Sequence, residues 1–265
     1  MVQHRGIHVT TPNVARIYDY WLGGKDNFAA DRDAAEKILT LIPEARFAAR
    51  ANRAFLGRAV QFLARAGIRQ FLDIGTGLPT QANVHEVAHQ VNPGARVVYV
   101  DNDPVVLAHA RALLNDTGAT VIIEADLRDP QKILEDPGLR TLIDFGEPVA
   151  VLMVAILHFI TEAEDPLAIV SRFREVMVPG SYLALSHVTA DPRPHAEAEV
   201  TAVYREATAP MVPRSHAQVG AFFDGFELVE PGVVYAPQWR PDVGSTTLVK
   251  DAERSFMLAG VGRKA

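Results

Sequence analysis

The stretch Phe71-Leu72-Asp73-Ile74-Gly75-Thr76-Gly77-Leu78-Pro79-Thr80 decides the fold of this chain. It begins as a short apolar run that ends in an acid, a pattern typical of a buried strand. The two glycines that follow let the backbone approach a ligand where a side chain would collide. In an open α/β sheet, ligands bind outside the carboxyl ends of the strands, where this turn would lie. Taken alone, the turn is equally consistent with a structural link between a strand and a helix.

Strands and helices alternate after this stretch. Further apolar runs predict buried strands at four places, residues 96–100, 121–123, 149–154 and 182–186. Runs that are apolar throughout indicate a parallel sheet covered by helices on both faces. Two late strand-like runs, 226–229 and 256–261, have no clear helix between them and favour an antiparallel hairpin at the sheet edge. We therefore expect an α/β, Rossmann-like sheet of seven strands, five of them parallel and two in the hairpin.

The chain divides into two parts by its patterning. Residues 1–67 are expected to form an N-terminal helical segment, and residues 68–265 the Rossmann-like domain. A polar stretch at about 189–215, with proline at both ends, interrupts the second part. We expect this insertion to help form a substrate pocket.

The first helix of the N-terminal segment is expected to act as a lid. Thr11 is the expected N-cap, and Gly23-Gly24 the stop. Tyr18 or Trp21 would then cover a bound ligand and exclude water from it. The alternative is a helix that packs on the core, with the two glycines as its cap.

Acids also stand at the ends of the second and third predicted strands. Asp101, followed by Asn102, is placed to accept hydrogen bonds from both hydroxyls of a ribose. Asp126 would accept the amino group of an adenine, with Leu127 against the ring face. The alternative is that such acids cap the following helices, as Asp103 is expected to do. Two acids at successive strand ends, beside a glycine turn, favour ligand binding.

The same turn favours S-adenosylmethionine (SAM) over a dinucleotide. The dinucleotide fingerprint G-x-G-x-x-G, started at Gly75, needs its last glycine where Thr80 stands. Pro79 also removes a backbone N–H that a pyrophosphate would need at this place. SAM has no phosphate, and its positive sulfonium is compatible with Asp73 and the other acids.

Composition and charge limit the function further. The 265 residues carry a formal net charge of −6 and no basic block, which disfavours a nucleic-acid partner. The absence of cysteine excludes disulfides, thiolate nucleophiles and cysteine-based metal sites. The longest apolar run, residues 149–160, is too short to span a bilayer, and the first residues lack a signal-peptide core. We expect a cytoplasmic protein without membrane association.

Four segments of the chain resemble one known family. They are ARIYDYWLGGKDNF at 15–28, RANR at 50–53, FLDIGTGLPT at 71–80 and GVGRK at 260–264. Together they are similar to the bacterial S-adenosyl methyltransferase family, or methyltransferase family 19, within the class I methyltransferases. The resemblance implies a SAM-binding Rossmann-like fold and methyl transfer, with S-adenosylhomocysteine as product. It leaves the methyl acceptor open.

One residue departs from the general class I pattern D-x-G-x-G-x-G. Pro79 occupies the place of the third glycine, a feature that the resembled family shares. The contacts of other methyltransferases therefore do not transfer closely to this turn. On the turn itself, Asp73, Gly75, Thr76 and Gly77 are the expected cofactor-binding residues.

Three residues outside the turn complete the expected site. Arg53 would direct its guanidinium to the methionine carboxylate of SAM, with a solvated arginine as the alternative. Ala155, at the end of the fourth strand, is expected to contact the cofactor. His158 follows that strand, where class I enzymes place residues that face the reacting methyl. It is a candidate general base, with a structural hydrogen-bonding histidine as the alternative.

No metal site is expected. His187, Asp191 and His195 are spaced four residues apart, as helical metal ligands often are. However, Pro192 and Pro194 break any helix that would align them.

The sequence therefore predicts a SAM-dependent methyltransferase that acts on a small-molecule acceptor. Because the methyl group of SAM is already activated, the protein mainly supplies alignment and a dry pocket. A non-catalytic SAM sensor, an NAD(P)-dependent oxidoreductase and an aminopropyl transferase that binds decarboxylated SAM are the alternatives. The oligomeric state is left open.

Overall fold

A computed structural model describes residues 8–79, 83–113, 118–192, 197–242 and 249–265 of the chain. Its centre is one sheet, in the order β3-β2-β1-β4-β5-β8-β6, with β7 also paired to β8. The strands are β1 (Gln70–Ile74), β2 (Arg96–Asp101), β3 (Thr120–Glu124), β4 (Ala150–Val154), β5 (Tyr182–Val188), β6 (Glu227–Leu228), β7 (Val234–Tyr235) and β8 (Met257–Arg263). The expected parallel core and antiparallel edge are therefore confirmed.

Strands β1 to β5 are parallel and form the centre of this sheet. β1 lies between β2 and β4. The strands that follow β1 in the chain are therefore added first on one side of it and then on the other. Every residue of β1 and β4 is buried, as the unbroken apolar sequence of β4 predicts; in β1 the burial includes the polar Gln70 and Asp73. The carboxyl ends of the five strands consequently meet along one edge of the molecule.

The antiparallel edge has one strand more than expected. β8 runs antiparallel to β5, and both β6 and β7 pair with β8 on its other side. A turn separates β6 from β7, and in it the Gly232 N–H donates to the Val229 carbonyl at 2.9 Å. The turn therefore divides the strand beside β8 into two short pieces. Pro231 lies in this turn and has no N–H to give to a sheet ladder. The sheet therefore has eight strands among the described residues where seven were expected.

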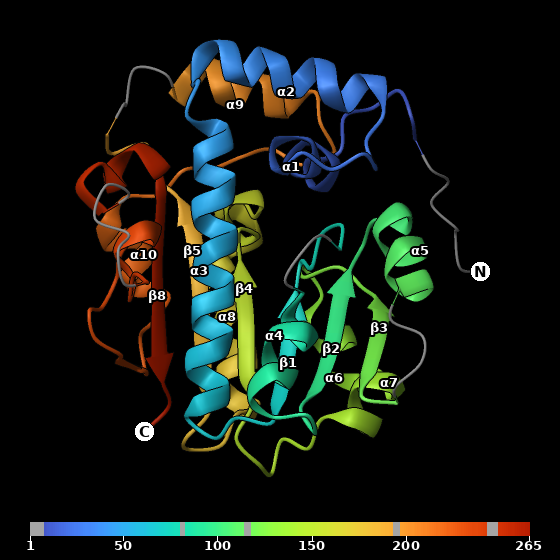
Figure 1. The fold of residues 1–265 in the computed structure, drawn as a ribbon, viewed down its shortest axis with the longest axis vertical. Coiled ribbons are helices and arrows are strands. Elements are labelled where there is room, and N and C mark those ends of the chain that lie inside the picture. The colour runs from blue at the N-terminus through green and yellow to red at the C-terminus, as the bar shows by residue number, and fades with distance from the viewer. Residues whose placement is uncertain (1–7, 80–82, 114–117, 193–196, 243–248) are drawn as a thin grey trace.

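Helices surround the sheet (Figure 1). They are α1 (Val14–Leu22), α2 (Ala29–Leu41), α3 (Ala45–Arg65), α4 (Val84–Val91), α5 (Pro104–Leu113), α6 (Pro130–Glu135), α7 (Pro137–Leu142), α8 (Pro166–Val176), α9 (Glu197–Arg205) and α10 (His216–Ala221). None of the described helices is both long and apolar enough to cross a membrane.

One helix start differs from the sequence-based expectation. The N-cap of α1 is Asn13 and not Thr11, because the Asn13 side chain accepts the backbone N–H groups of Ala15 and Arg16. α4 likewise begins after an asparagine, at Val84 with Asn83 as its N-cap. Asn13 and Asn83 both offer an amide oxygen directly before an apolar helical face.

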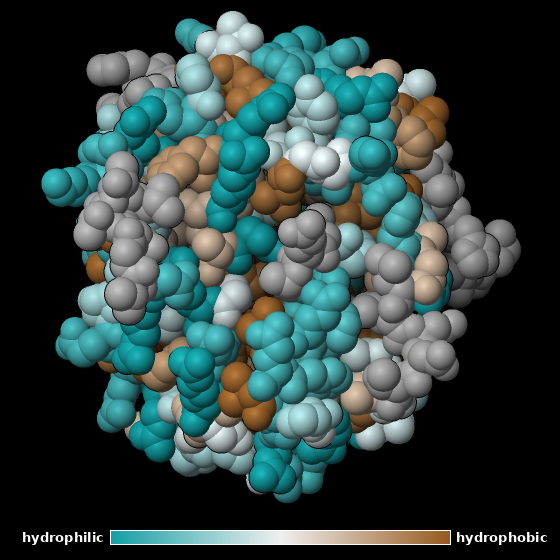
Figure 2. Space-filling model, in the orientation of Figure 1, coloured by the Kyte–Doolittle hydropathy of each residue, from teal (hydrophilic) through white to brown (hydrophobic). Residues whose placement is uncertain are grey.

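A hydrophobic core lies on each face of the sheet. On one face, α3 packs along the strands, and its Phe55 ring meets the Trp239 ring edge-on at 5.4 Å between centroids. On the other face, residues of α6, α7, α8 and α10 form the larger core, with Ile133 and Phe173 almost fully buried. Figure 2, which views the molecule from the side of α3, shows a mostly polar surface with apolar residues in scattered groups.

A third core lies above the carboxyl ends of the strands. It joins α1, α2, the first turns of α3 and α9, with Ile17, Ile38, Val200 and Tyr204 among its buried residues. Figure 1 shows α1, α2 and α9 lying across this end of the sheet. We call these three helices the helical cover. The N-terminal segment and the insertion of the sequence analysis thus pack against each other, although they are far apart in the chain.

The packing of α3 on the sheet predicts a large loss of stability on truncation. Leu63 is fully buried on this helix, so Leu63→Ala is expected to lower the free energy of unfolding by about 2–5 kcal/mol. Leu167 on α8 is 49% exposed and provides the same substitution as a control, with an expected change within about 0.5 kcal/mol. Chemical denaturation followed by circular dichroism measures both, and equal effects would contradict the packing described here.

Candidate functional site

A cavity of about 550 Å³ lies between the carboxyl ends of the strands and the helical cover. The structure brings every residue that the sequence analysis selected to its wall. These residues are Tyr18, Arg53, Asp73, Gly75, Thr76, Gly77, Asp101, Asn102, Asp126, Leu127, Ala155 and His158. They come from α1, α3, the ends of four strands and the segments that follow those strands. Their individual roles remain predictions.

The glycine turn after β1 forms part of the cavity floor. Gly75 has φ +74°, and a Cβ added there would lie 2.6 Å from the Ile156 side chain, so no larger residue fits. Gly77 has φ +67°, which favours glycine, and open space lies where its Cβ would be. Its backbone N–H donates to Asp101 Oδ2 at 2.9 Å. The turn is therefore tied to the end of β2 and leaves room for a ligand above Gly77.

Asp73 is a buried acid and Asp101 a partly buried acid on the same floor. Burial raises the pKa of Asp73 to about 7, although the nearby charge of Arg53 partly opposes this. Burial likewise raises the pKa of Asp101 to about 6, against the backbone N–H groups of Asp103 and Gly77, which stabilise the carboxylate. Both carboxylates would gain from a cationic or hydroxyl-bearing ligand that offsets their desolvation.

A chain of hydrogen bonds joins the helical cover to the strand ends. The Tyr18 hydroxyl donates to the Ala49 carbonyl at 2.9 Å and accepts from Asn52 Nδ2 at 3.0 Å. Asn52 Oδ1 accepts from the Ser186 hydroxyl, which in turn accepts from the Ala155 N–H at 3.0 Å. Ala155 itself has φ +57°, a strained conformation for alanine at the end of β4. The network therefore fixes α1, α3, β4 and β5 to one another at the cavity.

Asn52 was not selected from the sequence, although it lines the cavity and is buried. The signal was present, because Asn52 is a polar amide on the buried side of α3. A buried amide inside a helix must find hydrogen-bond partners, and here these are Tyr18 and Ser186.

His158 is buried beside a second histidine. Its ring lies 5.5 Å from the His187 ring, and Nδ1 has no hydrogen-bond partner within the described part of the chain. Burial, together with the neighbouring His187 and Arg214, holds the pKa of His158 well below its ordinary value. The imidazole is therefore neutral at physiological pH.

Arg214 holds the segment that carries His158 in place. Its side chain is almost fully buried and donates to the carbonyls of Leu157 and Ile160 at 3.0 and 2.9 Å. It also donates to Nε2 of His187 at 2.9 Å, so the Nδ1–H of His187 donates to the Val188 carbonyl. Arg214 was missed because a single arginine in a proline-containing insertion looks like a solvated residue.

The comparisons with known proteins decide the family. The model of the S-adenosyl methyltransferase family matches residues 1–265. The chain belongs to this family. It is thus a SAM-dependent methyltransferase whose cofactor is SAM, and its sheet has the class I methyltransferase plan.

Solved structures agree with this assignment. A DUF574 family protein from Streptomyces avermitilis is 44% identical, with a TM-score of 0.93 over 97% of this chain and 99% of that protein. A methyltransferase candidate from Thermobifida fusca is also 44% identical, with a TM-score of 0.90 over 100% and 99% of the two chains. Human N-acetylserotonin methyltransferase in complex with SAM shares the fold alone, at 13% identity, a TM-score of 0.50 and 96% and 63% coverage. No curated protein sequence matches this chain.

In this methyltransferase, Asp126 already has partners at the cavity rim. Asn102 Nδ2 donates to its Oδ2 at 3.1 Å, and the Arg128 guanidinium pairs with the same oxygen at 3.0 Å. Partial burial would raise the pKa of Asp126, but the backbone N–H and the charge of Arg128 hold it below its ordinary value. Arg128 also pairs with Glu164 at 2.6 Å. The sequence analysis did not anticipate this rim of alternating charges.

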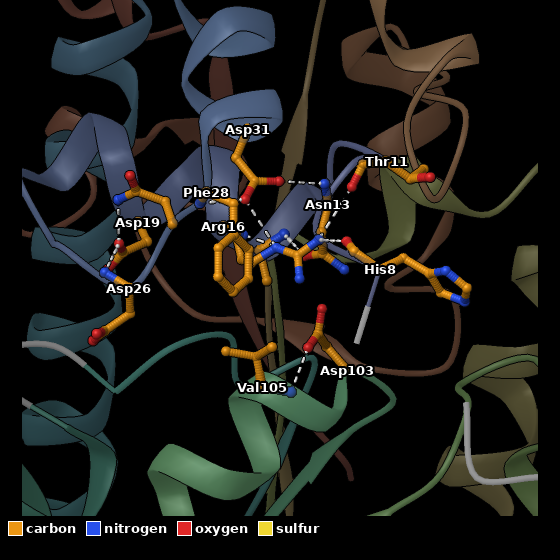
Figure 3. Close-up of polar contacts among 12 residues, drawn as sticks. His8, Thr11, Asn13, Arg16, Asp19, Asp26, Phe28, Asp31, Asp103 and Val105 are labelled. Carbon is orange, nitrogen blue, oxygen red and sulfur yellow. Dashed lines mark hydrogen bonds and ion pairs between the residues drawn. The ribbon is translucent and has the colours of Figure 1, made fainter. Parts of the chain in front are cut away.

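The first helix of the methyltransferase does cover the cavity, and it is firmly attached. Arg16 lies buried, with Nε 3.0 Å from the Asp31 carboxylate in an ion pair, and Asp31 also accepts the backbone N–H groups of Asn13 and Phe28 (Figure 3). Gly23 caps the helix in the left-handed conformation. The helix therefore packs on a core and also lines the cavity, while its role as a lid over a bound ligand stays a prediction.

The possible metal ligands are not brought together in the part that the structure describes. No group of three or more His, Asp or Glu residues placed to hold a metal ion occurs there. Of the three residues considered, His195 lies outside the described ranges. His187 has both ring nitrogens engaged by Arg214 and Val188.

The raised pKa of Asp73 predicts a pH-dependent gain of stability in Asp73→Asn. An acid whose pKa is raised in the folded state destabilises that state as pH rises from its unfolded pKa near 4 to its folded pKa of about 7. The variant avoids this loss, so its advantage is expected to be small near pH 4 and to reach roughly a few kcal/mol by pH 7. Thermal unfolding without ligand between pH 4 and 8 measures the difference.

The exposed Asp33 on α2 provides the matched Asp33→Asn control. Its stability is expected to follow that of the wild-type protein at every pH. A constant difference between Asp73→Asn and the wild-type protein across this range would contradict a buried, proton-binding Asp73.

Proposed function

We propose that this methyltransferase binds SAM over the ends of β1, β2 and β3 and methylates a small molecule held beside it in the same cavity. This proposal rests on one observation: all the cofactor-binding residues predicted from the sequence, and His158, line the same cavity. A cavity of about 550 Å³ under a helical cover lies in the size range of small-molecule sites. A macromolecular acceptor would have to insert one side chain or base into this space.

Each of the acids at the ends of β2 and β3 would bind a different part of the adenosine of SAM. Asp101 keeps free lone pairs beside its bonds from Gly77 and Asp103, and these would accept the ribose hydroxyls. To accept the adenine amino group, Asp126 would have to release one of its present hydrogen-bond donors. Asn102 is the donor to be displaced, because it carries no charge and is bound less strongly than Arg128. Leu127 lines the cavity next to it and would cover the ring face.

The methionine part would lie toward α1 and α3. Arg53 lines the cavity there and lowers the pKa of Asp73 by its charge, so the two side chains are close in space. The guanidinium would bind the cofactor carboxylate, and Asp73 would lie near the positive end of the cofactor. The donor set of the cavity therefore fits a ligand that carries hydroxyls, a carboxylate and a positive charge.

When bound, SAM supplies an activated methyl group on a positively charged sulfur. The protein's own contribution is to align the acceptor, exclude water and receive a proton where the acceptor carries one. His158 is the candidate for the last of these, because it is neutral and lines the cavity after β4. Arg214 would act on it as a positioning residue through the Leu157 and Ile160 carbonyls.

The alternatives of the sequence analysis are not favoured. An NAD(P)-dependent oxidoreductase and an aminopropyl transferase would both require a family other than the one that the whole chain matches. A non-catalytic SAM sensor would bind the cofactor with the same acids but would have no use for an acceptor space.

Calorimetry with SAM, S-adenosylhomocysteine and NADH tests the cofactor half of this proposal. The wild-type protein is expected to bind both adenosyl ligands and not NADH. Asp101→Ala removes an acceptor that hydrogen-bonds as a charged group, so both affinities are expected to fall by about 10- to 100-fold. Asp33→Ala, an exposed acid on α2, is the matched control. NADH binding, or adenosyl binding that ignores Asp101, would contradict the proposed site.

A further inference from the structure

The wall of the cavity includes residues beyond the predicted cofactor-binding residues, and its charged groups are unevenly distributed. The charged side chains that line it within the described ranges come from residues before and in α1, from α3, and from the ends of β1 to β3. They are Arg16, Asp19, Arg53, Asp73, Asp101, Asp103, Asp126 and Arg128, together with the titratable His8. The side formed by α2, α9 and the end of β5 contributes none.

We call this uncharged side the acceptor chamber. Its wall is formed by Ile38, Ile42, Val188, Val200, Tyr204 and Met211. These residues belong to the third hydrophobic core, and four of them are buried while Ile42 and Val188 are partly buried. Transfer of an unpaired charge into such surroundings is strongly unfavourable. A ligand that fills the chamber would therefore be uncharged over most of its surface.

Aromatic rings line the path from the reacting end of the cavity into this chamber. The His158 ring lies 4.3 Å from the Phe159 ring, and the Phe159 ring lies 5.8 Å from the Tyr204 ring. The three rings form one row from the end of β4 to α9, and all three residues line the cavity. Such a row favours a flat aromatic ligand, because aromatic pairs add to the gain from burial.

Two polar groups along this row lack partners. No hydrogen bond to the Tyr204 hydroxyl occurs within the described part of the chain, and burial alone raises its pKa. Nδ1 of His158 also has no partner there. Nδ1 of His158 is enclosed, whereas the Tyr204 hydroxyl is not fully enclosed and Tyr204 lines the cavity. A ligand in the chamber would therefore offer the Tyr204 hydroxyl a hydrogen-bond partner. A hydroxyl on the ligand suits this role, because it can both donate and accept.

We infer that the acceptor chamber takes an uncharged aromatic molecule that carries a phenol-type hydroxyl, and that this hydroxyl oxygen is the methylated atom. The inference rests on the proposed function and names the substrate class of that site. A lone pair of the oxygen forms the new C–O bond to the methyl carbon, and the C–S bond breaks with its electron pair left on sulfur. The hydroxyl proton passes to the neutral imidazole of His158 and from there to water, while Tyr204 hydrogen-bonds the ligand.

Binding of naphthol to the protein saturated with S-adenosylhomocysteine tests this inference. Naphthol is uncharged at pH 7, and naphthoate, with its carboxylate at the same ring position, is the charged counterpart. Calorimetry is expected to detect naphthol and to find naphthoate at least about tenfold weaker, because its charge would be buried without a partner. Equal or tighter binding of naphthoate would overturn the inference.

Tyr204→Phe removes only the hydroxyl that faces no partner. Naphthol affinity is expected to fall by about three- to tenfold, as for one lost hydrogen bond, while S-adenosylhomocysteine affinity stays unchanged. Tyr235→Phe, on β7 and away from the cavity wall, makes the same change as a control and is expected to leave both affinities unaltered. Unchanged naphthol binding in Tyr204→Phe would overturn the role of this hydroxyl and with it the proposed class.

The two levels of proposal fail in distinguishable ways. If the wild-type protein does not bind S-adenosylhomocysteine, the proposed cofactor site is wrong and this inference falls with it. If S-adenosylhomocysteine binds and naphthol does not, the cofactor site stands and the acceptor class is wrong. Transfer of labelled methyl from SAM to the naphthol oxygen, absent with naphthoate, would be the positive result.

Discussion

The hydrogen bond from the Gly77 N–H to the Asp101 carboxylate holds together the part of the fold on which the site depends. It joins the turn after β1 to the end of β2, so the two central strands present their carboxyl ends at one level. The Asp101 carboxylate also accepts the Asp103 N–H and thereby starts the segment that leads into α5. Asp101, a partly buried acid with a raised pKa, thus organises backbone that glycine alone would leave loose.

Above this floor, the cavity is completed by segments from opposite ends of the chain. α2 comes from the N-terminal segment and α9 from the insertion after β5, and the two helices share a hydrophobic core. Charged groups come from the strand ends, α1 and α3, and apolar groups from the side of α2 and α9. The strand ends expose backbone and capping acids, whereas α2 and α9 present their apolar faces to each other and to the cavity.

The sequence was sufficient for the elements that local patterns define. Short, mainly apolar runs identified the five parallel strands, and the acids Asp101 and Asp126 were placed at the cavity because parallel strands end on the same side. What the sequence did not show depends on contacts between distant segments. Arg214 is buried because it donates hydrogen bonds to carbonyls of the segment after β4, which is distant in the sequence. Arg128 belongs to the cavity rim because it pairs with Asp126 and Glu164. The division of the outer strand into β6 and β7 likewise required knowledge of its pairing with β8.

The buried ion pair between Arg16 and Asp31 has a consequence for how ligands exchange. Separating the two side chains would leave an uncompensated charge inside the protein, which typically costs about 3–5 kcal/mol. α1 is therefore not free to lift away from α2, and any opening of the cover moves the two helices as one rigid piece. A ligand that leaves past the cover would therefore require α1 and α2 to move together, a larger displacement than the lifting of one short helix.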